Sequence, residues 1–308
     1  MFVSKLGLLD LPASVHNWLT SFLKGRTHST VFEGQTSGKL PITASVVQGS
    51  ALGPALYAIN AADPTPRHQG NILLKFADDT YLLIPSRNLN TTDLELDNIE
   101  RWATLNNLVL NRAKSKELIF FPPKSRGTVS LAPPVLDSIE RVYTLKCLGV
   151  LISTRFSFSE HISAVLKSCS SDLFALYTLK TKGLNESMLN IAFKSIVLSK
   201  LMYASPFWWG FTTAADKERL EAFIRKAKRT NYFKSSQSFA DLCLEADQKL
   251  LNKVLDNTQH VLHSYLPPRV THTYNTRGQK LNRNFALPPK NTLRAMGFLT
   301  RLLYDCSY

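Results

Sequence analysis

The apolar positions between residues 71 and 85 fall into two short runs separated by a polar pair. One run spans 72–76, the other spans 81–84, and Asp78 and Asp79 lie between them. Short apolar runs bounded by turn-forming residues are typical of strands. The pattern therefore predicts a hairpin with strands near 72–77 and 80–84 and the two aspartates at the turn.

Helical and strand-like patterns alternate through the rest of the first half. Pro12 precedes apolar residues at helical spacing, which predicts a helix over 12–24 with one apolar face made by Val15, Trp18, Leu19 and Phe22. A helix over 92–108 carries a stripe that includes Trp102, which favours a core position for this residue over a base-stacking platform. The remaining predicted elements are strands near 28–33, 41–47 and 117–121, a helix that opens at Gly53-Pro54, and a hairpin over 143–153.

The second half is helical. Four segments have helical periodicity and start signals, at 159–181, 185–205, 214–234 and 237–265, and a proline-containing tail follows Pro267. A mixed first half followed by a helical second half predicts an α+β protein with an antiparallel sheet, divided into regions 1–153 and 154–308.

The positive charge of the chain is concentrated in the second half. The 308 residues carry a formal net charge of +14 and are 44% apolar and 19% charged, a composition typical of a globular protein. Residues 151–308 contain 22 Lys/Arg against 11 Asp/Glu, so this half supplies most of the excess. Excess positive charge favours a polyanionic partner, for which nucleic acid is the natural candidate, although an anionic membrane or solubility alone would also account for it.

The Asp78-Asp79 pair has the chemistry of a metal site. Two carboxylates at a tight turn can approach one site, and Mg²⁺ prefers such hard oxygen ligands. The alternative is that both aspartates are present only because aspartate is a good turn former. A sequence of two residues does not separate these interpretations.

The segments around the pair resemble the palm of reverse transcriptases of non-LTR retrotransposons, which are LINE-type and here jockey-like. The resemblance rests on Gln48-Gly49-Ser50 with Gly53-Pro54, on Phe76-Ala77-Asp78-Asp79, on Trp102 through Lys114, and on Leu145 through Val150, in family order and with family-like spacing. It runs from about residue 6 to 153 and continues more loosely over a thumb-like remainder.

This resemblance implies an RNA-directed DNA polymerase, a nucleotidyltransferase that uses two Mg²⁺ ions, an RNA template, a DNA primer and deoxynucleoside triphosphates. The implied roles are metal binding and catalysis for Asp78 and Asp79, leaving-group protonation for Lys114, nucleotide or template binding for Gln48, Gly49, Ser50 and Phe76, and primer binding for Leu148 and Gly149. Simpler alternatives stay open for three of these features: a strand-to-helix turn at 48–54, a surface lysine at 114 and a simple bulge at Gly149.

The sequence departs from the family pattern in two ways. Val47 replaces the proline that usually precedes Gln48, which leaves the turn less constrained. A third catalytic aspartate, expected upstream in an Ala-Phe-Asp motif, has no counterpart, because Asp10 has the context of a turn or helix cap. We therefore expect little or no polymerase activity from these 308 residues alone, without the fingers and the family's endonuclease domain.

Residues 217–229 form the strongest binding candidate outside this region. Apolar residues recur at helical spacing, while Arg225, Lys226, Lys228 and Arg229 extend around the helix. The functional interpretation is phosphate contact, the simplest alternative is a solvated basic face, and a membrane-surface helix is a distant third.

Other features restrict the compartment and the function class. The four cysteines are widely separated, which argues against a zinc site and for a reducing compartment. No signal peptide or membrane span is predicted, so we expect an intracellular location, in the cytoplasm or the nucleus, and no membrane partner. Two alternatives to a polymerase fragment remain: a non-catalytic nucleic-acid-binding remnant, and a fragment that folds poorly because its sheet has an unpaired edge.

Overall fold

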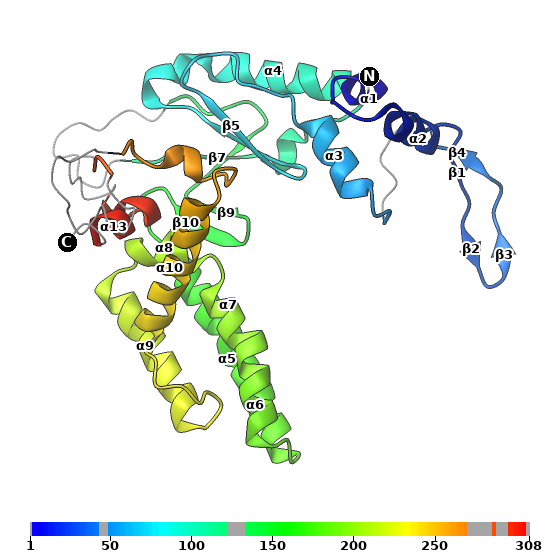
Figure 1. The fold of residues 1–308 in the computed structure, drawn as a ribbon. Coiled ribbons are helices and arrows are strands. Elements are labelled where there is room, and N and C mark those ends of the chain that lie inside the picture. The colour runs from blue at the N-terminus through cyan, green and yellow to red at the C-terminus, as the bar shows by residue number, and fades with distance from the viewer. Residues whose placement is uncertain (1, 43–48, 122–132, 270–284, 288–294, 306–308) are drawn as a thin grey trace. The chain divides into compact units, whose positions relative to one another are not determined.

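The computed structural model describes residues 2–42, 49–121, 133–269, 285–287 and 295–305. It forms two compact units (Figure 1). Unit 1 comprises residues 1–115 and 133–139, and unit 2 comprises residues 116–132 and 140–308. Both units combine helices with two-stranded sheets, so the predicted α+β class is confirmed at this level. The functional boundary at 153/154 stays a prediction, separate from the division into compact units.

The described residues of unit 1 form four helices and three small antiparallel sheets. The helices are α1 (Phe2–Leu6), α2 (Ala13–Leu23), α3 (Gly53–Ala61) and α4 (Thr92–Leu105). The strands are β1 (Thr27–His28), β2 (Val31–Phe32), β3 (Gln35–Thr36), β4 (Leu40–Pro41), β5 (Ile72–Phe76) and β6 (Asp79–Leu83), paired as β1 with β4, β2 with β3, and β5 with β6. Short 3-10 turns cover 86–91 and 112–114.

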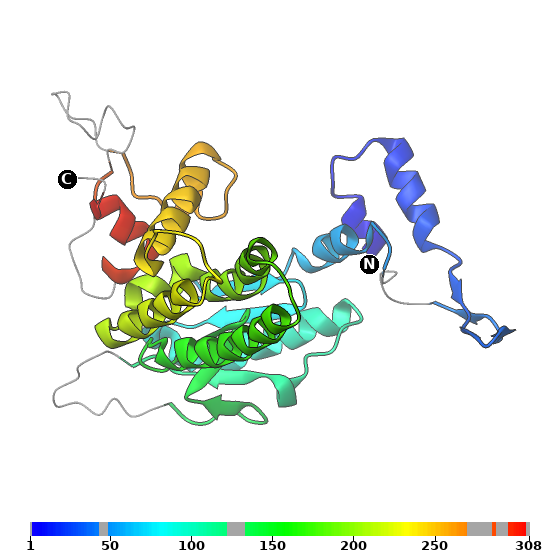
Figure 2. The same cartoon turned by 90° about the horizontal axis from the view of Figure 1, so that it is seen from below.

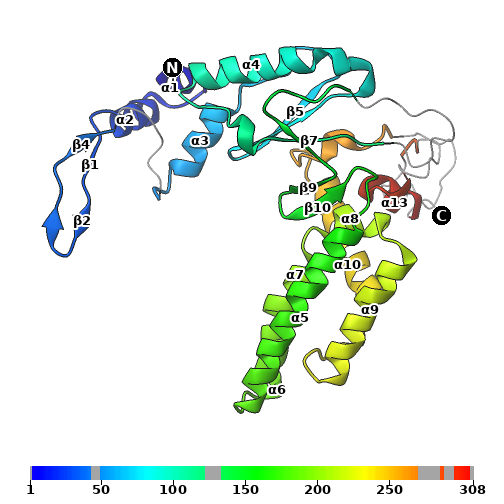
Figure 3. The same cartoon turned by 180° about the vertical axis from the view of Figure 1, so that it is seen from behind.

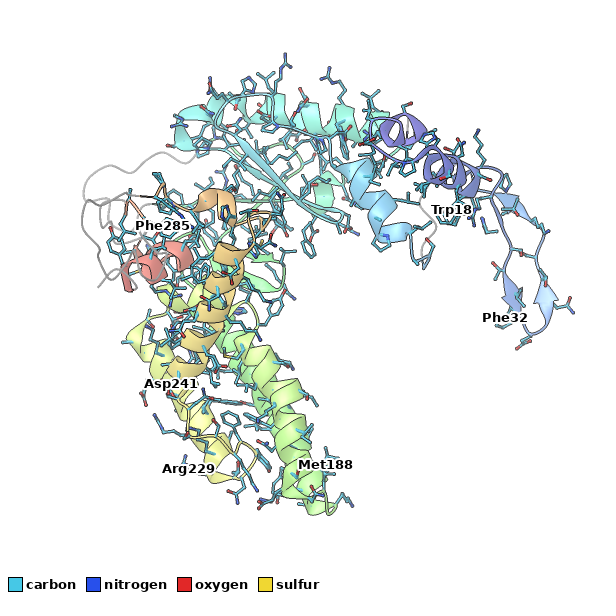
Figure 4. All side chains as sticks on the ribbon, viewed as in Figure 1. Trp18, Phe32, Met188, Arg229, Asp241 and Phe285 are labelled. Carbon is cyan, nitrogen blue, oxygen red and sulfur yellow. The ribbon has the colours of Figure 1, made fainter. Side chains whose placement is uncertain are left out.

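The first three helices of unit 1 share a small apolar core. Leu6, Leu19 and Leu56 are its buried members, one from each helix. The predicted apolar face of α2 is therefore only partly correct, because Val15 and Trp18 are exposed (Figure 4). The reason is that α2 packs only along Leu19 and its neighbours, so the other side of the predicted stripe has no element to cover it.

A buried carboxylate organises the other part of unit 1. Glu95 of α4 is fully buried and accepts hydrogen bonds from the backbone nitrogens of Arg67 at 2.9 Å and His68 at 2.8 Å, and from Asn71 Nδ2 at 2.9 Å. Burial by itself disfavours the charged form, but these donors outweigh it and lower the pKa of Glu95. Glu95 lies in the first turn of α4, and its carboxylate holds the 67–71 turn against this helix.

Residues 26–42 form a projecting ribbon of paired strands (Figure 2). The predicted strand at 28–33 corresponds to β1 and β2. The chain turns back at Glu33 and Gly34, both with positive φ, and returns through β4, which ends at Pro41, so of the strand predicted near 41–47 only its first two residues are described. Residues 43–48 lie outside the described residues.

Unit 2 combines short strands with longer helices. The strands are β7 (Lys116–Leu118), β8 (Glu140–Val142), β9 (Thr144–Cys147) and β10 (Val150–Ser153), with β7 parallel to β8 and β9 antiparallel to β10. The helices are α5 (Ser159–Thr181), α6 (Glu186–Ala192), α7 (Ser199–Met202), α8 (Ser205–Trp208), α9 (Ala214–Arg229), α10 (Phe239–Asp256) and α13 (Phe298–Asp305), and a π-helical turn covers Phe193–Leu198. The predicted 143–153 hairpin and 159–181 helix are confirmed.

Three predicted helices of unit 2 have different bounds. The segment predicted as one helix over 185–205 breaks after Met202, where Ala204 adopts a φ of 52° and α8 begins a new direction. The helix predicted over 214–234 ends at Arg229, and the chain reverses through Asn231 so that Tyr232 and Phe233 enter the core. The helix predicted over 237–265 begins as α10 at a capping box of Ser238 and Asp241, but it ends at Asp256, and only a short 3-10 turn at His263–Tyr265 follows within the predicted range.

The helices of unit 2 enclose one large apolar core. Helix α5 lies beside α6 and α7, and α9 and α10 complete the bundle (Figure 3). Phe158, Phe193, Trp208 and Phe239 are among its largest fully buried side chains. Among the helices in the described parts of the chain, none is long and apolar enough to cross a membrane.

Candidate catalytic site and nucleic-acid surface

The two aspartates lie at the tip of the β5–β6 hairpin, as the sequence predicts. Phe76 pairs with Asp79 across the hairpin, so Ala77 and Asp78 form a two-residue turn. Ala77 has a φ of 52°, a conformation that tight hairpin turns require at this position. Both carboxylates are exposed, and Asp79 Oδ2 accepts a 3.4 Å hydrogen bond from the Tyr81 hydroxyl.

Asp78 lines a cavity of about 1020 Å³ between the hairpin turn and α3. The α3 side consists of small residues and Tyr57, and the hairpin side consists of Lys75, Ala77 and Asp78. Asp79 is absent from this lining. The structure thus assigns the two adjacent carboxylates to different environments, with Asp78 at the cavity and Asp79 beside Tyr81.

A charged cluster adjoins the cavity through Lys75, which belongs to both. Asp63 Oδ1 accepts hydrogen bonds from Lys5 Nζ at 2.7 Å and from the Trp102 indole nitrogen at 2.8 Å. The Lys75 ammonium lies 4.9 Å from the centre of the Trp102 ring and donates to Thr80 Oγ1 at 3.0 Å. Trp102 is therefore half-buried and contacts both the Asp63 carboxylate and the Lys75 ammonium. The prediction of a core residue is only partly correct.

The cluster changes the ionisation of its members. Burial lowers the pKa of Lys75, an effect that the negative charges of Asp78 and Asp63 partly offset. Burial, assisted by the charge of Asp78, raises the pKa of Tyr57. Burial opposes ionisation of Asp63, but its hydrogen bonds from Lys5 and Trp102 prevail and lower its pKa. The Asp78 side of the hairpin is thus a site where charges interact through a partly buried environment.

The donor set of the hairpin suits a hard divalent cation. Asp78 and Asp79 offer carboxylate oxygens only, and Mg²⁺ is usually held by one or two carboxylates together with water and phosphate oxygens. Within the described ranges, no group of three or more His, Cys, Asp or Glu residues is placed to hold a metal ion. The two aspartates are thus adjacent in sequence and suitable in chemistry, but the described residues do not gather them with further protein ligands.

The other predicted residues of this region are placed differently. Gly49 lines the same cavity as Asp78, Ser50 starts the turn into α3, and Gln48 lies outside the described residues. Phe76 is exposed on the hairpin. Lys114 ends the short turn after α4, is exposed, and is absent from the lining of the cavity. Asp10 does not cap α2, whose N-cap is Pro12 and has no side-chain cap hydrogen bond.

In unit 2, Leu148 and Gly149 form the two-residue turn between β9 and β10. Both have positive φ, at 45° and 88°, which is the geometry of a tight hairpin turn. The hydroxyl of Tyr203 donates to the Leu148 carbonyl oxygen at 2.9 Å, and its ring would lie 3.2 Å from a Cβ added at Gly149. Tyr203 therefore braces this turn. Sequence analysis missed it, because the two segments are 55 residues apart and no local pattern links them.

The four basic residues of α9 differ in their contacts. Arg225 forms an ion pair with Glu218, and Lys228 Nζ donates to the carbonyl oxygens of Ser236 and Gln237. Lys226 and Arg229 are exposed and form no ion pair with another described residue (Figure 4). The apolar face predicted for this helix is confirmed, since its predicted members Leu220, Phe223, Ile224 and Ala227 are all buried.

The hairpin of this α+β unit places an Asp-Asp pair near a glycine-containing turn. This arrangement is the one expected of a nucleic-acid polymerase. Residues 4–152 match the family model described as reverse transcriptase (RNA-dependent DNA polymerase). This matched segment, just under half of the chain, is similar in sequence to reverse transcriptases of the non-LTR retrotransposon type.

The relatives support the same family. The chain is 29% identical over 236 residues to the probable RNA-directed DNA polymerase from transposon X-element of Drosophila melanogaster, covering 71% of this chain and 25% of that protein. It is 30% identical over 168 residues to the RNA-directed DNA polymerase from mobile element jockey of the same species, covering 50% of this chain and 18% of that protein. The chain thus spans about a quarter or less of the length of these curated relatives. No solved structure matches it.

Proposed function

We propose that residues 1–153 form part of a reverse transcriptase palm and residues 154–308 a helical thumb-like region of an RNA-directed DNA polymerase. The observation that carries the proposal is the position of Asp78, which reaches the cavity that Gly49 and α3 also line. In this function the cavity takes the incoming deoxynucleoside triphosphate, and the RNA template and DNA primer run past the hairpin.

The residues have distinct roles in this proposal. Asp78 and Asp79 would hold Mg²⁺, which when bound supplies electrostatic stabilisation for phosphoryl transfer. Gln48, Gly49, Ser50 and Phe76 would contact the nucleotide or the template. Leu148 and Gly149 would contact the primer, because a turn without a Cβ at Gly149 permits close approach of a strand. Lys114 would donate a proton to the leaving group, a role that requires its exposed side chain to reach the substrate.

A chimeric polymerase tests this function. Residues 4–152 would replace the matching segment of the jockey polymerase, and template-dependent primer extension would be measured with Mg²⁺. We expect extension that Asp78→Asn reduces by several orders of magnitude and that Asp10→Asn, an exposed aspartate before α2, leaves unchanged. Equal extension by the chimera and by its Asp78→Asn variant would refute the metal-ligand role.

The polypeptide of 308 residues alone provides a second arm of the test. We expect no measurable extension from it, because no group of three or more possible metal ligands comes together within the described residues. Incorporation that depends on template and disappears in Asp78→Ala would contradict this expectation.

The second candidate function is nucleic-acid binding without catalysis. It is favoured by Lys226 and Arg229, whose exposed charges at the end of α9 are available for phosphates. Each phosphate contact releases counterions, so log K falls with log salt by about 0.7 per contact for single strands and about 0.9 for duplex DNA. Arg225 and Lys228 have partners within the protein, so Lys226 and Arg229 are the first pair to test among the four predicted residues.

Titrations with labelled single-stranded and duplex oligonucleotides at several salt concentrations test this surface. We expect Lys226→Gln/Arg229→Gln to reduce the salt slope, by about 1.4 on single strands. The matched control is Lys249→Gln/Lys253→Gln, which removes two exposed charges from α10. An unchanged slope in the α9 variant would show that these charges are only solvated.

A further inference from the structure

The ribbon of residues 26–42 is exposed along its whole length. Every residue from Thr27 to Pro41 is exposed, including Val31 at 68%, Phe32 at 72% and Leu40 at 60% of their maximal surface. An isolated two-stranded hairpin is at best marginally stable in water, since it buries too little apolar surface to offset the entropy of ordering its chain. A ribbon of this kind is suited to a role in which a partner covers it.

The ribbon nevertheless consists of two paired segments that follow one another along the chain and are linked by a backbone hydrogen bond. Thr27 pairs with Pro41 and Val31 pairs with Thr36, and the Ser37 backbone nitrogen donates to the Thr30 carbonyl at 2.9 Å between them. Two residues lie between His28 and Val31, whereas three lie between their respective partners Leu40 and Thr36, so the returning strand carries one extra residue, as in a bulge. A bulge increases the local right-handed twist of a strand pair.

The base of the ribbon is fixed to α2. The guanidinium carbon of Arg26 lies 3.8 Å from the centre of the Phe22 ring, and Arg26 Nε donates to the Phe22 carbonyl at 2.6 Å. The Ile42 nitrogen donates to the Arg26 carbonyl at 2.8 Å and closes the ladder. The twisted ribbon is therefore anchored at one end and free at the other, where Phe32 lies (Figure 4).

The chemistry of the ribbon indicates an anionic partner. Residues 24–42 contain Lys24, Arg26 and Lys39 against a single acid, Glu33. Lys24 and Lys39 are exposed and form no ion pair with another described residue, so both charges are open to a ligand. The ribbon thus combines positive charge at its base with an apolar tip, whereas the surface of α9 is basic only.

We propose that the ribbon of residues 26–42 inserts into a groove of duplex DNA, with Lys24 and Lys39 at the phosphates and Phe32 against the base edges. The major groove of B-form DNA admits a two-stranded ribbon, whereas the deep and narrow major groove of duplex RNA does not. In the major groove an apolar side chain such as phenylalanine can contact the methyl group of thymine. The ribbon is a second nucleic-acid surface, separate from α9 and from the cavity at Asp78.

Binding of the full chain to labelled duplex DNA at several salt concentrations tests this proposal. Lys24→Gln/Lys39→Gln should reduce the salt slope by up to about 1.8 and weaken binding by about eightfold per contact at 0.1 M salt. Phe32→Ala should weaken binding several-fold with an unchanged slope, because it removes apolar contact and no charge. Duplex RNA of the same sequence should bind without sensitivity to either change. Lys249→Gln/Lys253→Gln is the charge-matched control.

The possible results separate this surface from the proposed function. If the α9 variant Lys226→Gln/Arg229→Gln reduces the slope but both ribbon variants bind duplex DNA as the unchanged chain does, the ribbon proposal is overturned and the α9 surface stands. If sedimentation shows a dimer that Phe32→Ala converts to a monomer, the ribbon binds a second copy of the chain and the DNA proposal is likewise overturned. Loss of duplex binding in the ribbon variants alone supports it, whatever the outcome at Asp78.

Discussion

The two units of this protein are stabilised in different ways. Unit 2 encloses a continuous apolar core that includes Phe193, Trp208 and Phe239, whereas the apolar core of unit 1 has three buried members, Leu6, Leu19 and Leu56, among the described residues. Unit 1 instead depends on polar groups, with Glu95 holding one turn and Asp63 joining Lys5 to Trp102. Unit 1, which carries the candidate catalytic residues, is thus the unit that depends on hydrogen bonds and charges. Removing one partner of such an interaction leaves the other partner unsatisfied and lowers the stability of the fold.

The largest contrast is expected from aromatic truncation. Phe193→Ala should destabilise unit 2 by about 3–5 kcal/mol, because Phe193 is fully buried and its ring centre lies 5.2 Å from that of Phe233. Trp18→Ala, an exposed aromatic of unit 1, should change stability by less than about 0.5 kcal/mol. Segment-resolved hydrogen exchange in denaturant measures both. Equal losses of protection in the two variants would contradict the described difference between the cores.

A smaller effect is expected from removing the charge of Glu95. Glu95→Gln keeps the size of the side chain but turns an amide nitrogen toward the donors of Arg67, His68 and Asn71, which should cost unit 1 about 1–3 kcal/mol. Hydrogen exchange of the 67–71 turn and α4 should increase, while α5 and α10 stay protected. Glu218→Gln, which affects an exposed ion pair on α9, is the control and should have little effect on either unit.

A local effect is expected at the 148–149 turn. Tyr203→Phe removes the hydrogen bond to the Leu148 carbonyl and should cost about 0.5–1.5 kcal/mol, expressed as faster exchange of the amides of 147–150. Tyr143→Phe is the matched control, since Tyr143 lies on the same hairpin but is 80% exposed. If the 147–150 amides exchange at the same rate in both variants, Tyr203 does not brace the turn.

The smallest effect is a difference in pH dependence. Burial lowers the pKa of His161 in unit 2, so its contribution to stability is complete above the unfolded value of about 6.5 and declines as the pH falls below it, by at most about 1.4 kcal/mol per pH unit. The pKa of Glu95 is also lowered, and the stability it gives unit 1 is lost only as the pH falls below its unfolded value of about 4.3.

Between pH 7.5 and 5, unit 2 should therefore weaken before unit 1. Pulse proteolysis in urea, with fragments assigned by mass spectrometry, measures this order. His161→Phe should remove the dependence, and a dependence that persists in this variant would assign it to another group.

The comparison also explains which features the sequence predicted correctly. The β5–β6 hairpin was predicted within one residue, because alternating apolar runs and an Asp-Asp turn are local signals. The 159–181 helix was predicted at the correct bounds for the same reason. The helix predicted over 185–205 was wrong near its C-terminal end, because helical periodicity continues through Tyr203 whereas Ala204 adopts a left-handed conformation before α8.

The sequence by itself determined the elements and the chemistry that depends on neighbours along the chain: the hairpin, the Asp78-Asp79 pair and the amphipathic α9. Only the tertiary structure decided which of these groups meet. It placed Asp78 at the cavity and Asp79 beside Tyr81. It gave Arg225 an ion pair with Glu218 and Lys228 two backbone carbonyl acceptors. It also placed Tyr203 against the 148–149 turn. The physical reason is that secondary structure follows short-range periodicity, whereas a hydrogen bond between residues 55 positions apart depends on how whole elements pack.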